Sequence, residues 1–255
     1  MGWPRMLAAP SRGTGLISGT TPDGPRSSGA RNGWKSESLT DSVTLTSPAA
    51  VVELLRRRGL RAQRRFGQSF LIDANILRRV VEAADLTPET GVLEVGPGLG
   101  VLTRALAERC RRVLAVELDQ GFCAALREET LAGLDNVELL PTDFLDLELP
   151  AVLSEALGPG PHTVVSNLPY SITTPALARF LEHREWFSHL VLMVQREVAD
   201  RLQAGPGSRT YGALSVLAQF HADLRRITVV PRRAFFPVPE VESALLRFDL
   251  RTAPR

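Results

Sequence analysis

Lysine is almost absent from the sequence, and cysteine and histidine are scarce. The 255 residues contain two cysteines, four histidines and a single lysine, so arginine carries nearly all of the positive charge. Cys110 and Cys123 form neither a CxxC pair nor a disulfide framework, and the histidines show no metal-ligand spacing. We therefore expect no metal site and a reducing compartment.

A long apolar run and a strong net charge are also missing. No stretch reaches the roughly 18 apolar residues of a membrane span, so we expect no contact with a membrane and a cytoplasmic protein. A net charge of +2 is weak evidence for a nucleic-acid partner. Arginine in place of lysine suits RNA recognition, although a GC-rich genome that favours arginine codons is the preferred explanation.

The first 45 residues differ in composition from the rest. They are rich in Gly, Ser, Thr, Pro and Arg, with no hydrophobic periodicity, so we expect residues 1–45 to be a disordered N-terminal extension. A transit peptide and a misplaced start codon both remain open as its origin. We expect residues 46–250 to form one folded domain and residues 251–255 to be a tail.

Strand and helix signals alternate through the folded part. Ser47 and Asp73 are predicted to cap two helices, each followed by apolar residues at helical spacing. Apolar runs then predict strands at residues 92–95, 113–116, 137–140, 163–166 and 190–194, with helical stretches between them, and a last strand pair at 225–230 and 244–248. This pattern predicts an α/β fold with a mainly parallel, seven-stranded sheet and an antiparallel edge strand.

A glycine turn follows the first predicted strand, with the sequence EVGPGLG from Glu94 to Gly100. Gly96 and Gly98 allow a tight turn and a close backbone approach to a ligand. A purely structural turn is the alternative for such a motif. The spacing is neither the GxGxxG of dinucleotide enzymes nor a phosphate-binding P-loop.

Single acids follow the next two predicted strands. Glu117 is suited to accept hydrogen bonds from both hydroxyls of a ribose, and Asp119 is a competitor for that role. Asp143 is suited to accept from an adenine amino group, with Phe144 packing on the ring. Ordinary solvated acids are the alternative for each position alone, but together with the glycine turn they predict an adenosine-bearing cofactor.

The tetrapeptide Asn167-Leu168-Pro169-Tyr170 follows the fourth predicted strand. The exocyclic nitrogen of adenine is a poor nucleophile because its lone pair is delocalised into the ring. An amide oxygen and a backbone carbonyl can accept its two N–H bonds, and Pro169 stiffens the backbone that presents such a carbonyl. Tyr170 can stack on the base. The tetrapeptide therefore indicates methylation of a base amino group, with an ordinary turn as the alternative.

A basic run precedes these motifs. Six arginines lie between Arg56 and Arg65, and no acid occurs between Glu53 and Asp73. We interpret the run as a patch that contacts the RNA backbone, and a solvated helix end is the alternative. The residues assigned to the patch are Arg56, Arg57, Arg58, Arg61 and Arg64.

Residues 47–250 resemble the KsgA-type ribosomal RNA adenine dimethyltransferases, a family that also contains the Erm methyltransferases. The resemblance rests on RFGQSFL (Arg65–Leu71), EVGPGLG, NLPYSITTP (Asn167–Pro175), two blocks at Gln195–Arg201 and Tyr211–Ser215, and PRRAFFPVP (Pro231–Pro239). It implies a Rossmann-like methyltransferase that uses S-adenosylmethionine. Two departures are Ser69, where the family has Asn, and the lack of a helical C-terminal subdomain before the chain ends at Arg255.

The resemblance also assigns roles to individual residues. It implies that the cofactor is bound by Ser69, Leu71, Gly96, Gly98, Glu117, Asp143 and Asn167, and that catalysis depends on Asn167, Pro169 and Tyr170. It further implies that Tyr170 and Phe235 sandwich the target base. A core phenylalanine beside a strand is the alternative for Phe235.

The favoured function is dimethylation of N6 on two adjacent adenosines near the 3′ end of 16S ribosomal RNA. We expect a monomer whose partner is ribosomal RNA within a small-subunit precursor particle. An Erm-like methyltransferase for 23S ribosomal RNA and a non-catalytic RNA-binding assembly factor are the alternatives, and a nicotinamide dehydrogenase is a more distant one.

Overall fold

The computed structural model describes residues 45–62 and 68–251, all of which belong to one compact unit. Arg64 of the expected arginine patch and the residues Arg65, Phe66 and Gly67 of the RFGQSFL motif lie outside the described residues. Most of the expected 1–45 extension also lies outside them. The domain boundaries expected at residues 45 and 250 therefore remain predictions.

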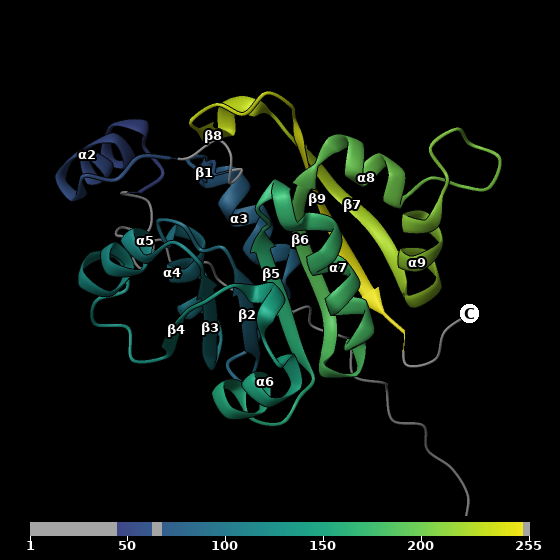
Figure 1. The fold of residues 1–255 in the computed structure, drawn as a ribbon, viewed down its shortest axis with the longest axis horizontal. Helices are drawn as coiled ribbons and strands as arrows, with labels where there is room; N and C mark the ends of the chain where they lie inside the picture. The colour runs from purple at the N-terminus through teal and green to yellow at the C-terminus, as the bar shows by residue number, and fades with distance from the viewer. Residues whose placement is uncertain (1–44, 63–67, 252–255) are drawn as a thin grey trace, which may run out of the picture. The chain divides into compact units, whose positions relative to one another are not determined.

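The main sheet of the described chain has seven strands in the order β4-β3-β2-β5-β6-β9-β7 (Figure 1). The strands are β2 (Gly91–Val95), β3 (Arg112–Glu117), β4 (Val137–Pro141), β5 (His162–Asn167), β6 (Phe187–Gln195), β7 (Ala222–Val230) and β9 (Ser243–Leu250). The first five in spatial order are parallel, whereas β9 runs antiparallel between β6 and β7. The prediction of a mainly parallel α/β sheet with an antiparallel pairing at one edge is confirmed.

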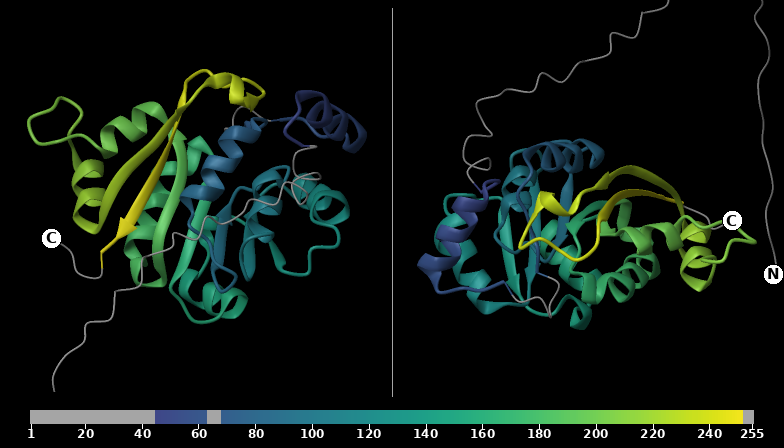
Figure 2. Two further views of the ribbon diagram at one scale, coloured as in Figure 1. Left: turned by 180° about the vertical axis from the view of Figure 1, so that it is seen from behind. Right: turned by 90° about the horizontal axis from the view of Figure 1, so that it is seen from above.

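Helices cover both faces of this sheet (Figure 2). The α-helices are α2 (Pro48–Arg58), α3 (Ala74–Ala83), α4 (Val101–Ala107), α5 (Gln120–Ala125), α6 (Leu149–Leu157), α7 (Thr173–Glu182), α8 (Arg196–Leu202) and α9 (Ala213–His221). A π-helical turn, η2 (Leu126–Thr130), extends α5. Short 3-10 turns are η3 (Phe144–Asp146), η4 (Tyr170–Ile172), η5 (Arg184–Trp186) and η6 (Arg232–Ala234).

Local chemistry explains where the first helices begin and end. The Ser47 hydroxyl accepts a hydrogen bond from the Ala50 N–H at 3.1 Å, and Gly59 ends α2 with a φ of 63°. The Asp73 carboxylate accepts from the N–H groups of Asn75 and Ile76 at the start of α3. The two caps predicted from the sequence are confirmed.

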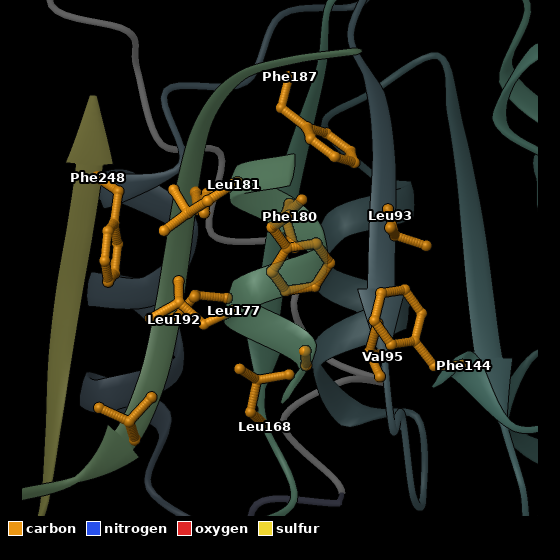
Figure 3. Close-up of a cluster of buried hydrophobic side chains, with 14 of the residues drawn as sticks. Leu93, Val95, Phe144, Leu168, Leu177, Phe180, Leu181, Phe187, Leu192 and Phe248 are labelled. Atoms are coloured by element: carbon orange, nitrogen blue, oxygen red, sulfur yellow. The ribbon is translucent and has the colours of Figure 1, made fainter. Parts of the chain in front are cut away.

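The core lies in two layers, one on each face of the sheet. On one face, α6, α7, α8 and α9 pack against alternate strand residues, with Phe180 of α7 fully buried against Phe144 and Phe187 (Figure 3). On the other face, α3 and α4 pack against the residues that point the opposite way, such as Val92 and Val165. Burial on both faces holds the parallel strands in register and fixes where their carboxyl ends lie.

The order of the strands reverses direction at β2. The chain moves outward from β2 to β3 and β4, and then returns to place β5 on the other side of β2. Ligands of open α/β sheets bind outside the carboxyl ends of the strands at such a switch point. The fold thus brings together the segments that follow β2, β3, β4 and β5.

A second, two-stranded sheet lies beside the main one. Its strands are β1 (Phe70–Leu71) and β8 (Phe235–Phe236), which pair antiparallel, and the Ile72 N–H donates to the Ala234 carbonyl at 2.8 Å. Figure 1 shows the two strands side by side at one end of the main sheet. This pairing, which no sequence pattern predicts, joins the start of the fold to its last hairpin.

The central strand β2 carries a buried carboxyl group. Glu94 is 2% exposed, and its Oε2 has no hydrogen-bond partner among the described residues. Burial raises the pKa of Glu94 to about 8, so the carboxyl is protonated at neutral pH. The group is therefore neutral in the folded protein under conditions in which it is ionised in the unfolded chain.

This raised pKa makes the stability depend on pH. The contribution of Glu94 is fully present below its unfolded pKa of 4.5 and is lost as the pH rises towards 8. We expect the free energy of unfolding of the wild type to fall across that range relative to that of Glu94→Gln. The variant serves as the reference because Gln does not titrate. Urea unfolding of both proteins at a series of pH values measures the difference. A difference that stays constant from pH 4.5 to 8 contradicts the prediction.

Candidate active site

A cavity of about 410 Å³ lies at the carboxyl ends of the central strands. This volume is in the range of small-molecule sites. Its walls come from the segments after β2, β3, β4 and β5, with β1 and Val51 of α2 on the outer side. Every residue that the sequence predicted to bind a cofactor lines this cavity: Ser69, Leu71, Gly96, Gly98, Glu117, Asp143 and Asn167.

The glycine turn after β2 forms the floor of the cavity. Gly96 and Gly98 have φ values of 72° and 58°, which residues with a side chain rarely adopt. A Cβ atom at Gly96 would lie 2.8 Å from Cγ of Pro169, and one at Gly98 would lie 3.1 Å from the ring of Phe70. Glycine is therefore required by the turn and by close packing against two other walls of the cavity.

Glu117 lies at the end of β3 and is 7% exposed. Its two carboxylate oxygens accept hydrogen bonds from the N–H groups of Gly98 and Asp119, both at 3.0 Å. Burial raises the pKa of Glu117, while these two N–H groups act in the opposite direction. The competitor Asp119 also lines the cavity, but one of its oxygens caps α5 by accepting from Gly121 and Phe122.

Asp143 follows β4 and begins the 3-10 turn η3. Its Oδ1 accepts a hydrogen bond from the Leu145 N–H at 2.8 Å, which orients the carboxylate at the cavity wall. Phe144 is 2% exposed, and its ring lies 5.1 Å from that of Phe180 in the core. Phe144 therefore contributes to the lining from a position fixed by core packing.

The described lining of the cavity is acidic. It contains Glu117, Asp119 and Asp143, beside the protonated carboxyl of Glu94, and no histidine, lysine or arginine among the described lining residues. A ligand with positive charge is favoured by such a wall, whereas the pyrophosphate of a dinucleotide is not. This charge pattern argues against the nicotinamide dehydrogenase considered above.

The tetrapeptide after β5 alternates between the cavity and the core. The Nδ2 of Asn167 donates a hydrogen bond to the Ser69 carbonyl at 3.1 Å, and both Asn167 and Pro169 line the cavity. Leu168 is 1% exposed and packs into the core, as Figure 3 shows. The carbonyl of Pro169 accepts from the Ile172 N–H and the Thr173 hydroxyl. The backbone from Asn167 to Pro169 is thus fixed by its neighbours on both sides.

Ser69 and Leu71 come to the cavity through β1. The Ser69 hydroxyl donates to the Pro237 carbonyl at 3.1 Å, so the side chain that replaces the family's Asn bonds to the chain beyond β8. The Ser69 carbonyl is the group that accepts from Asn167. Leu71 is 4% exposed and pairs with Phe235 in the register of β1 and β8.

Tyr170 lies just beyond the cavity on η4. It is partly buried, and its Oη lies 2.7 Å from the Oγ of Ser243, the first residue of β9. Burial raises the pKa of Tyr170, so its phenol keeps its proton at neutral pH. Ser243 was not identified from the sequence, because a lone serine at the start of a strand carries no motif.

Phe235 is a core residue in this structure. It is 1% exposed and belongs to the apolar cluster that includes Leu71 and Val230. Neither face of its ring is open to a base. The structure therefore agrees with the alternative of a core phenylalanine and shows no exposed stacking surface at Phe235. The β1–β8 pairing is the reason, because it turns Phe235 inward.

Three of the arginines assigned to the basic patch are paired with acids. Arg56 is paired with Glu53 in the same helix, Arg57 with Glu129, and Arg58 with both Glu128 and Glu129. These acids offset the charge of the three arginines, and the contact of the patch with the RNA backbone stays a prediction. Glu128 and Glu129 lie about 70 positions along the chain, on the π-helical turn η2, where sequence spacing could not reveal them. Arg61 is exposed to solvent just beyond the end of α2.

Metal ligands and membrane spans are both absent from the part of the chain that the structure describes. No group of three or more of its His, Cys, Asp or Glu side chains is arranged to hold a metal ion. None of the described helices is both long and apolar enough to cross a membrane.

Several bacterial proteins are similar to this chain along most of its length. The chain is 45% identical over 218 residues to a ribosomal RNA small subunit methyltransferase A from Pelotomaculum thermopropionicum, which covers 83% of this chain and 74% of that protein. It is 42% identical over 211 residues to the protein of the same name from Geobacillus kaustophilus, with 82% and 72% covered.

Among solved structures, a dimethyladenosine transferase from Plasmodium falciparum superposes with a TM-score of 0.64 at 26% identity, over 71% of this chain and 63% of that one. The 23S rRNA methyltransferase ErmE superposes with a TM-score of 0.63 at 35% identity, over 72% and 71%. The family model for ribosomal RNA adenine dimethylase matches residues 59–255. The chain therefore belongs to the ribosomal RNA adenine dimethylase family of S-adenosylmethionine-dependent methyltransferases.

Proposed function

We propose that the protein transfers methyl groups from S-adenosylmethionine to N6 of two adjacent adenosines near the 3′ end of 16S ribosomal RNA. The observation that carries this proposal is the anchored amide of Asn167 between an acidic cavity and Tyr170. The names of the bacterial relatives support a small-subunit substrate.

The cavity fits S-adenosylmethionine in charge and in size. This cofactor carries a sulfonium and an ammonium group, and the described lining carries acids without a compensating base. The unpartnered Oε2 of Glu94 is a buried polar atom at this wall that a ligand can satisfy. We propose that Gly96 and Gly98 cradle the methionine part, while Glu117 binds the ribose and Asp143 the adenine. Ser69 and Leu71 would complete the site from β1.

Asn167 is proposed to bind the target amino group. Because its Nδ2 donates to the Ser69 carbonyl, its Oδ1 is oriented to accept an N–H bond from adenine. The Pro169 carbonyl already accepts two hydrogen bonds, which leaves the Leu168 carbonyl as the second acceptor. These two acceptors favour a tetrahedral N6 whose lone pair points at the methyl group.

The proton balance of the reaction requires no strong base. The cofactor supplies a methyl group that carries formal positive charge to N6, and the N–C bond forms as the bond to sulfur breaks. The methylated nitrogen is acidic and loses one proton to solvent. The described lining of the cavity contains no histidine, in agreement with this scheme. Tyr170 is proposed to stack on the base and hold it in line with the methyl group.

Two alternatives remain open for the target and the role. The similarity to ErmE favours the Erm-like methylation of 23S RNA as the second candidate. A non-catalytic assembly factor is the third. We propose further that the enzyme acts as a monomer in the cytoplasm, on RNA within a small-subunit precursor particle.

The decisive experiment uses labelled S-adenosylmethionine with small-subunit particles that lack the modification. We expect mass spectrometry of the RNA to find dimethyladenosine at two adjacent positions near the 3′ end of 16S RNA. Modification confined to large-subunit RNA would support the Erm-like alternative. An absence of methyl transfer to either RNA would support the assembly factor.

Asn167→Ala tests the catalytic centre. We expect turnover to fall by about two orders of magnitude or more, because the variant has no preorganised amide oxygen to bind the reacting amino group. Cofactor binding should persist at reduced affinity, as measured by calorimetry. Asn136→Ala is the matched control, because the amide of Asn136 also donates to backbone carbonyls but lies outside the cavity. Unchanged turnover in Asn167→Ala would refute the assigned role.

The arginines of α2 are proposed to contact RNA phosphates in competition with their acidic partners. Neutralising Arg56, Arg57 and Arg58 should weaken RNA binding and make its salt dependence less steep. The logarithmic slope should decrease by up to about 0.7–0.9 for each phosphate that is no longer neutralised by an arginine. Titrations at several salt concentrations measure this slope.

The double change Glu128→Gln and Glu129→Gln is the matched control for the arginine patch. If the arginines contact RNA, this change frees two of them and strengthens RNA binding. If the arginines only attach α2 to η2, both sets of changes lower the stability of the protein and leave the salt slope equal to that of the wild type. That second result would contradict the patch.

A further inference from the structure

One hydrogen bond connects the proposed base-stacking residue to the interior of the sheet. The Oη of Tyr170 lies 2.7 Å from the Oγ of Ser243, which is 0% exposed. The hydroxyls of Tyr170 and Ser243 are thus hydrogen-bonded to each other, and either one can be the donor. The bond spans 73 positions in the sequence.

The two ends of this bond differ in how firmly they are held. Ser243 begins β9 and pairs with Gln195 of β6 on one side and with Val230 of β7 on the other. Its backbone is therefore fixed by two neighbouring strands. Tyr170 begins the short turn η4, which has no buried residue and no side-chain cap. The hydroxyl bond is thus a tether from a surface turn to a fixed point in the sheet.

We propose that Ser243 is a positioning residue for methyl transfer, which fixes where the Tyr170 ring lies against the target base. This inference rests on the proposed stacking role of Tyr170. A tyrosine side chain has two torsions, and Oη lies on the axis of the second. A hydrogen bond at Oη therefore restricts the first torsion, which sets the direction in which the ring projects from η4. Stacking depends on where the ring lies over the base, so a ring that is free to change its first torsion aligns the base less often for transfer.

The position of Tyr170 and Ser243 predicts which kinetic quantities change when their hydrogen bond is removed. Neither Tyr170 nor Ser243 lines the cofactor cavity. Removal of the bond should therefore lower kcat and raise KM for RNA, while the Kd for S-adenosylmethionine stays within about twofold of the wild type, less than the effect of one ordinary hydrogen bond. A general disruption of the structure would change all three quantities together.

The test compares Ser243→Ala, Tyr170→Phe and the double variant, with methyl transfer to RNA as the readout. We expect each single change to lower kcat/KM for RNA by about two- to tenfold, the size of one ordinary hydrogen bond. The double variant should lose no more than the larger single effect, because both changes remove the same bond. Ser215→Ala is the matched control, since Ser215 is also 0% exposed but bonds to the Arg201 carbonyl, away from the cavity.

A second measurement reports the bond without catalysis. The chain contains only two tyrosines, Tyr170 and Tyr211, so ¹³C labelling of the tyrosine Cζ gives two assignable NMR signals. Ser243→Ala should shift the Tyr170 signal and leave that of Tyr211 unchanged, because Ser243 bonds to the hydroxyl of Tyr170, whereas Tyr211 is exposed. Ser215→Ala should leave the Tyr170 signal unchanged.

The outcomes separate this inference from the proposed function. Additive losses in the double variant, or wild-type kcat/KM in Ser243→Ala, overturn the positioning role while the enzyme remains a methyltransferase. If the wild type transfers no methyl group to ribosomal RNA, the proposed function fails, and the NMR signals then decide whether Ser243 holds the ring. A Tyr170 signal that does not respond to Ser243→Ala overturns the inference in either case.

Discussion

The contact between Gly96 and Pro169 is the constraint on which the rest of the site depends. The backbone of the first glycine turn lies so close to the proline ring that even a methyl group at Gly96 would approach it to 2.8 Å. The turn after β2 and the segment after β5 therefore share one wall, and their strands are neighbours in the sheet. In the proposed reaction the cofactor and the base would meet at this wall, where no side chain of Gly96 separates the two segments. The strand order thus brings the two segments together, and the missing side chain at Gly96 lets them touch.

Charge divides the molecule into two regions with different tasks. The cofactor cavity has an acidic described lining, which suits a cationic ligand and repels nucleic-acid phosphates. The arginines of α2 lie outside this cavity, but Glu53, Glu128 and Glu129 already offset much of their charge. In the proposed contact with RNA, the phosphates would compete with these acids for the guanidinium groups. Such competition would lower non-specific affinity for RNA and leave more of the recognition to the base itself.

Much of the fold and of the cofactor site could be predicted from the sequence, because the signals are local. Strand patterns and the caps at Ser47 and Asp73 depend on neighbouring residues, and glycine turns and strand-end acids recur at fixed places in such sheets. The predictions failed where distant segments meet. The acids that pair with Arg57 and Arg58, and the β1–β8 pairing that buries Phe235, are tertiary contacts with no local pattern. The serine partner of Tyr170 was missed for the same reason.

The two-stranded sheet has a consequence for the order in which the protein is made. β1 contributes Ser69 and Leu71 to the cofactor cavity, yet its hydrogen-bond partners lie at Ala234, Phe235, Phe236 and Pro237. Ser69, whose carbonyl anchors Asn167, is thus near the start of the folded chain. Pro237, whose carbonyl accepts from the Ser69 hydroxyl, is near its end. A ribosome must synthesise almost the entire domain before the cavity wall can close, and contacts at such separation form late in folding. A partly made chain with all four strand-end motifs already emerged therefore still lacks a finished cofactor site.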